Sequence, residues 1–177
     1  MKNLFLNFLE KNIGRLNKIE KIYVGLFFLS IIAGIIYGIN NPSYSKPYEE
    51  AGKLDLQEGE NNLTIFTKNF ATSGIDMFTA GIAGLYLNFV SFSIAGSFLF
   101  SQGTFAALFL ILFTFGIFEL LGSLFFGLIG LNFAQRIFSR FLKVRSDLKV
   151  KRVFAIALIL LFMASAIEYS LVIFLRA

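Results

Sequence analysis

Cysteine and histidine are both absent from the 177-residue sequence. Without cysteine, the chain forms no disulfide and has no thiolate for metal binding or nucleophilic attack. Without histidine, it lacks the commonest general base and the usual sensor of near-neutral pH. Ser-His-Asp and Cys-His catalysis are therefore excluded, and any metal site would have to use carboxylates. The sequence favours neither an enzyme nor a cofactor-binding protein.

Charged residues are also scarce, at 15% of the chain, whereas 56% of it is hydrophobic. Between Gly74 and Gln135, a stretch of 62 residues, the only charged side chains are Asp76 and Glu119. About 20 apolar residues suffice to cross a bilayer. Since a soluble domain of this size could not bury such a stretch, we expect an integral membrane protein.

We expect an all-α, polytopic membrane helix bundle, with a basic amphipathic interfacial helix over 1–21 and a transmembrane domain over 22–177. The amphipathic segment either lies in the head-group region or packs on the cytoplasmic end of the bundle. An acidic outside loop occupies 40–62 and a basic cytoplasmic loop 137–152. About five membrane segments are expected, at 22–39, 74–100, 104–116, 119–136 and 153–175.

The distribution of lysine and arginine predicts the orientation of the chain. Residues 1–21 hold five of these basic residues, 136–152 hold seven, and 40–62 hold two. The N-terminus and the second basic segment should therefore be cytoplasmic in the cell membrane. The net charge of +5 reflects this flanking of spans rather than nucleic-acid binding.

This orientation requires an odd number of crossings between residues 62 and 136, where the apolar pattern suggests two. The run 104–135 holds 32 residues, about 48 Å as one helix at ~1.5 Å per residue. The hydrocarbon core is only ~30 Å thick. Glu119 lies between Gly116 and Gly122, so we predict a break there that joins two short spans or a re-entrant pair.

Several polar residues of the apolar runs are candidate functional or structural positions. Glu119 is a proton or cation site, a polar lock, or a group that reaches water at the interface, since carboxylates inside membranes usually face protein or water. Glu168 lies in the last expected span and either pairs with another helix or reaches water. Asn88 shares a helical face with Gly84 in the second expected span. Asp76 would begin that span and act as an N-terminal cap.

The chain resembles the stage II sporulation protein M family in two segments. These are Phe115-Gly116-Ile117-Phe118-Glu119-Leu120 and the later Gly127-Leu128-Ile129-Gly130-Leu131. That family has His-Gly-x-x-Glu-hydrophobic-Pro-Ala followed by a glycine-rich helix. Gly116 and Glu119 fall on its Gly and Glu, and Asn69 matches an Asn before its second span. This chain departs from the pattern, because Phe115 replaces the His and Leu121 replaces the Pro.

The resemblance implies a five-span membrane scaffold; in spore formers, such a protein localises cell-wall hydrolases during engulfment. We therefore expect a scaffold or membrane-organising protein whose partners are membrane lipids and other membrane or cell-envelope proteins, with a homodimer left open. The alternative is a small transporter or channel that uses Glu119 as its proton or cation site. An intramembrane enzyme acting on lipids has little support.

Overall fold

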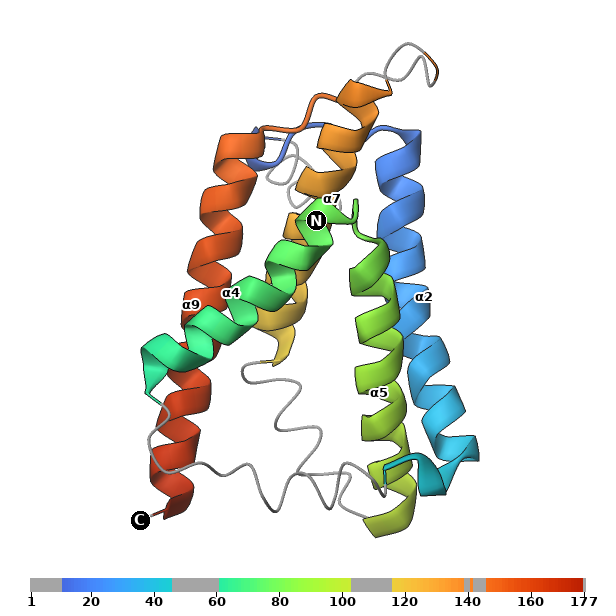
Figure 1. Ribbon diagram of the computed structural model, residues 1–177, viewed down its shortest axis with the longest axis vertical. Helices are drawn as coiled ribbons and strands as arrows, with labels where there is room; N and C mark the ends of the chain where they lie inside the picture. The colour runs from blue at the N-terminus through green and yellow to red at the C-terminus, as the bar shows by residue number, and fades with distance from the viewer. Residues whose placement is uncertain (1–10, 46–60, 103–115, 139–140, 142–145, 177) are drawn as a thin grey trace.

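The computed structural model describes residues 11–45, 61–102, 116–138, 141 and 146–176 (Figure 1). Every regular element in these residues is helical, so the all-α class is confirmed for this part of the chain. The elements are α2 (Lys18–Asn40), the 3-10 helix η1 (Pro42–Ser45), α4 (Asn62–Phe78), α5 (Ile82–Gln102), α7 (Ile117–Ile137) and α9 (Val150–Arg176). By length and composition, α2, α7 and α9 can each cross a membrane.

The start of α2 corrects the expected helix over 1–21. Residues 1–10 lie outside the described residues, and the chain leaves the helical conformation at Gly14, where φ is +96°. Asn17 then caps α2: its side chain accepts from the Glu20 backbone N–H at 3.0 Å, and the Glu20 carboxylate accepts from the Asn17 N–H at 2.8 Å. This reciprocal capping starts a new helix at Lys18.

Two glycines bring α2 and α5 into backbone contact. A Cβ atom on Gly34 would lie 2.5 Å from the carbonyl oxygen of Phe89, and one on Gly38 would overlap the carbonyl of Ser93. These two glycines form a Gly-x-x-x-Gly step, which allows close helix approach. Because successive glycines of α2 meet successive residues of α5, the two helices run in the same direction, as Figure 1 shows.

The expected span 74–100 is not one helix. It is divided at Thr79–Gly81, where Ala80 and Gly81 have φ values of +52° and +82° and the chain reverses direction (Figure 1). The Gly81 N–H bonds to the Asp76 carbonyl at 2.7 Å, a bond typical of a Schellman helix end. The Thr79 hydroxyl also accepts from the Ala83 N–H at 3.1 Å and so caps the start of α5.

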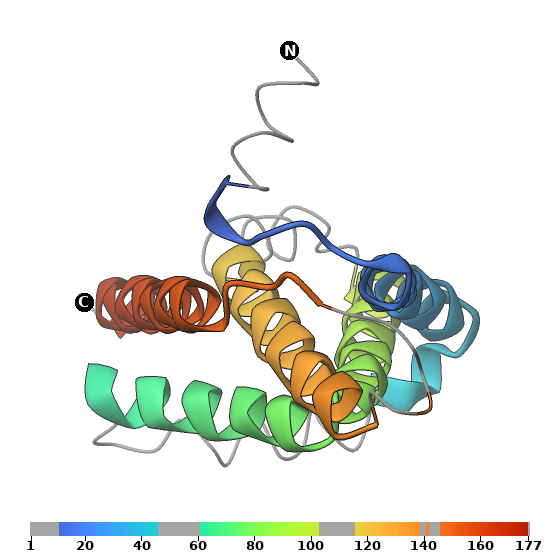
Figure 2. The same cartoon turned by 90° about the horizontal axis from the view of Figure 1, so that it is seen from above.

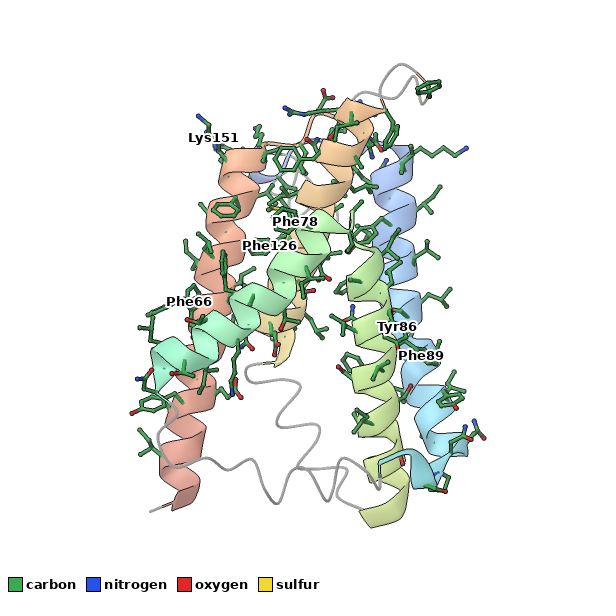
Figure 3. The ribbon with its side chains drawn as sticks, viewed as in Figure 1. Phe66, Phe78, Tyr86, Phe89, Phe126 and Lys151 are labelled. Carbon is green, nitrogen blue, oxygen red and sulfur yellow. The ribbon has the colours of Figure 1, made fainter. Side chains whose placement is uncertain are left out.

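Helix α4 crosses α7 and α9 obliquely and is attached to them by aromatic rings. Phe66 lies 5.9 Å from Phe162 of α9, and Phe70 lies 5.7 Å from Phe126 of α7, measured between ring centroids. Figure 3 shows Phe66 and Phe126 in the region where these helices meet. Seen from above, α7 lies between α9 on one side and α5 and α2 on the other (Figure 2). This arrangement makes α7 the central helix.

The start of α2, the end of α7 and the start of α9 share one end of the bundle (Figure 1). At this end the Lys149 N–H bonds to the Ile13 carbonyl at 2.8 Å, and the Lys149 ammonium bonds to the Lys11 carbonyl at 2.6 Å. Figure 3 shows Lys151 at the same end. The described parts of the two basic segments thus lie together, as the charge distribution predicts.

Candidate functional site inside the helix bundle

Glu119 and Glu168 come together in the structure. Glu119 lies in the first turn of α7 and Glu168 lies in α9, and both side chains are partly buried. Their carboxyl groups are close enough to interact electrostatically. Two carboxylates placed in this way repel each other when both are charged.

The two glycines on either side of Glu119 have different surroundings. Gly116 is the N-cap of α7 and provides no side-chain hydrogen bond. Gly122 faces α9, where an added Cβ would lie 2.7 Å from Cδ2 of Leu161. Helix α7 therefore begins close to the predicted joint, whereas the helical piece expected over 104–116 lies, apart from Gly116, outside the described residues.

Asn69 and Asn88 each have a buried amide nitrogen that meets no hydrogen-bond partner among the described residues. Asn69 lies two helical turns before Asp76 in α4, and Asn88 lies one turn after Gly84 in α5. Residues at these spacings share one helix face. The two asparagines therefore lie on the helix faces that also bear Asp76 and Gly84, which are in direct contact.

The sequence predicts that Asp76 caps the start of a helix, and this prediction is wrong. Asp76 lies in the last turn of α4, near the negative end of the helix dipole, and its residue is 1% exposed. The hydroxyl of Ser123 in α7 donates a hydrogen bond to its Oδ2 atom. Gly84 lies against the carboxylate, because an added Cβ would be 2.7 Å from Oδ2.

Tyr23 of α2 completes a group that we call the Asp76 cluster, which consists of Tyr23, Asp76 and Ser123. The Tyr23 hydroxyl lies against Gly127 of α7 and near Gly81 of the turn. Asp76 meets α7 at Ser123, one turn before Gly127, so Tyr23 and Asp76 lie at neighbouring turns of that helix. In the described part of the chain, neither the Tyr23 hydroxyl nor the Asp76 Oδ1 atom has a hydrogen-bond partner.

A second polar group, the polar clamp, joins three segments at the basic end of the bundle. Its members are Asn17, Glu20, Asn132, Gln135 and Ser146. The fully buried Glu20 carboxylate accepts from the Ser146 hydroxyl, which also accepts from the Asn132 amide at 2.5 Å. The Asn17 amide donates to the Gln135 side chain at 2.7 Å. These bonds connect the start of α2, the last turns of α7 and the segment before α9.

Neither group was identified from the sequence. Asp76 stands out in the sequence as a charge in an apolar run, but the turn that follows it, which places it at a helix end, carries no charge or proline. Ser123 is 47 positions away, and nothing local marks it as a partner. Glu20 lies among basic residues and resembles an ordinary charge of a solvated helix, although it is fully buried.

The described residues contain no group of three or more acidic side chains that could hold a metal ion. Comparisons with protein-family models, with curated proteins and with solved structures found no match to this chain.

Proposed function

We propose that this chain is an integral membrane scaffold that organises other membrane or cell-envelope proteins. The observation that carries the proposal is the way the helices are fastened to one another. Backbone contacts at Gly34 and Gly38 join α2 to α5, and Gly130 packs on the backbone of Met77 to join α7 to α4. The polar clamp then joins α2, α7 and the segment before α9. Helices that contact one another at several points keep a fixed arrangement, which suits a protein that positions its partners.

The resemblance to the stage II sporulation protein M family supports the same proposal. The matching Gly116 and Glu119 lie at the start of α7, and the matching Gly130 lies at the α4–α7 contact. In this proposal the motif shapes the central helix and its packing. The chain spans the cell membrane with its basic end in the cytoplasm, where basic residues are favoured.

The outer surface of α9 is suited to partner contact within the membrane. Ile159 is 59% exposed, and Met163, one turn later, is also exposed. In a membrane, this surface meets either lipid or another protein. Because membrane helices associate through packing rather than through the hydrophobic effect, a protein partner would match the shape of this surface.

Photo-crosslinking in native membranes tests the scaffold. A photoreactive benzoylphenylalanine in place of Ile159 should give discrete crosslinked products that contain other envelope proteins. The same residue in place of Phe154, whose ring lies 5.6 Å from that of Phe126 inside the bundle, should crosslink within the chain. Products from position 159 that contain only lipid or only this chain would contradict the proposal.

A small transporter or channel is the second candidate, and the Glu119–Glu168 pair favours it. Paired carboxylates between membrane helices are a common means of binding protons or cations during transport. Reconstituted protein in vesicles should then show cation or proton flux that Glu119→Gln abolishes and that Asp147→Asn, at an exposed position, leaves intact. The absence of flux in the parent protein under both ion and pH gradients would rule out this candidate.

A further inference from the structure

We propose that the Asp76 cluster binds a monovalent cation, sodium in particular, between α2, α4 and α7. The inference rests on neither proposed function, because an ion here could serve a rigid scaffold or a transporter. Around Asp76, a buried negative charge lacks a positive partner and two buried oxygen atoms lack hydrogen-bond partners among the described residues.

The charge around Asp76 is unfavourable without a cation. The residue is 1% exposed, so water does not stabilise its carboxylate. It also lies in the last turn of α4, where the helix dipole is negative and repels an anion. In the part of the chain that the structure describes, the groups placed at Asp76 are neutral: the Ser123 hydroxyl from α7, the backbone at Gly84 from α5 and, one turn further along α7, the Tyr23 hydroxyl from α2. A positive charge would relieve both effects.

The hydrogen bonding shows where the cation would bind. The Asp76 Oδ2 atom is occupied by the Ser123 hydroxyl, whereas Oδ1 has no partner among the described residues. The Tyr23 hydroxyl is likewise unpaired there, and it lies against Gly127 of α7, one turn after the Ser123 that bonds to Asp76. Unpaired buried oxygen atoms are costly. Asp76 Oδ1 and the Tyr23 oxygen are therefore the ligands that the site offers.

The chemistry of these ligands selects the class of ion. One carboxylate oxygen and one neutral hydroxyl provide a single negative charge. Divalent calcium and magnesium usually require several carboxylates or carbonyls, and no acidic triad exists in the described residues. Sites for sodium in membrane proteins commonly use the C-terminal end of an interrupted helix. Asp76 lies in the last turn of α4, just before the turn at Thr79–Gly81 where this helix ends.

Thermal unfolding of the purified full chain in detergent tests the site. Sodium chloride is compared with choline chloride at the same ionic strength and pH, so that only the cation differs. Binding to the folded state should raise the melting temperature in sodium by about 2–5 °C. Asp76→Asn should abolish this increase, and Asp147→Asn, which removes an exposed carboxylate at the basic end of the bundle, should retain it.

Tyr23→Phe provides a second variant if Asp76→Asn does not fold, because it removes only the hydroxyl oxygen. It should reduce the sodium-dependent increase in melting temperature. Equal melting temperatures in sodium and choline would overturn the proposal. An equal sodium effect in the parent and in Asp76→Asn or Tyr23→Phe would also overturn it. Stability that depends on pH but not on sodium would show that a proton neutralises Asp76 instead.

Discussion

At the scale of single residues, the fold depends on buried polar atoms whose partners come from distant parts of the chain. Glu20 accepts hydrogen bonds from its own helix cap and from Ser146, 126 positions away. Both donors point at carboxylate oxygens in a place that water does not reach. A hydrogen-bond acceptor at this buried position contributes more to the stability of the fold than a surface charge does, because its loss leaves a buried donor unpaired.

Glu20→Gln should therefore destabilise the protein. The amide keeps one oxygen but turns an N–H group toward one of the two donors, which should lower the free energy of unfolding by about 1–3 kcal/mol. Thermal unfolding in detergent measures the effect. Asp147→Asn, an exposed acid next to Ser146, should leave the melting temperature unchanged. If the two variants melt at the same temperature, the polar clamp does not stabilise the fold.

Gly84→Ala tests the contact between α5 and the Asp76 carboxylate. The new methyl group would lie between 2.7 and 2.9 Å from three atoms of that carboxyl group. Such overpacking should cost about 1–3 kcal/mol. Gly74→Ala in α4 is the matched control, because nothing lies within 4 Å of the added carbon, and alanine there should gain up to ~1 kcal/mol. Chemical denaturation of both variants should show effects of opposite sign.

At the scale of helices, the long apolar elements are predictable from the sequence, whereas the reversal inside the expected span 74–100 is not. The expected spans 22–39, 119–136 and 153–175 fall within α2, α7 and α9, because long charge-free runs with basic flanks leave few alternatives. The reversal at Thr79–Gly81 carries neither a charge nor a proline. It depends on a threonine hydroxyl and a left-handed Ala-Gly pair, which a hydropathy pattern does not distinguish from a helix.

Ala80→Gly distinguishes a turn from a continuous helix by the sign of its effect. In the turn, Ala80 has a φ of +52°, which a residue with a Cβ atom adopts at a cost. Glycine should therefore raise the stability by about 0.5–1 kcal/mol. In an uninterrupted helix over 74–100, the same substitution would cost ~1 kcal/mol. A lower unfolding midpoint for Ala80→Gly in denaturant would thus contradict the reversal.

At the scale of the whole molecule, the reversal also bears on the parity of crossings. The distribution of lysine and arginine predicts an odd number of membrane crossings between residues 62 and 136. A helix break near Glu119 is the feature expected to supply the additional crossing. The structure contains a reversal 40 positions earlier, where α4 runs toward the basic end and α5 runs away from it (Figure 1). Helix α7 then returns to the basic end, so both basic segments meet there.

Because the chain has no cysteine, single introduced cysteines report orientation without interference. Asp147→Cys lies exposed at the basic end, and Ser43→Cys lies exposed beyond the other end of α2. An impermeant maleimide added to intact cells should label position 43 and spare position 147. Inverted membrane vesicles should give the reverse pattern. Seven basic residues favour the cytoplasmic leaflet by about 1 kcal/mol each, so labelling of position 147 from outside would contradict a cytoplasmic basic end. Labelling of positions 43 and 147 from the same side would contradict an odd number of crossings between residues 62 and 136.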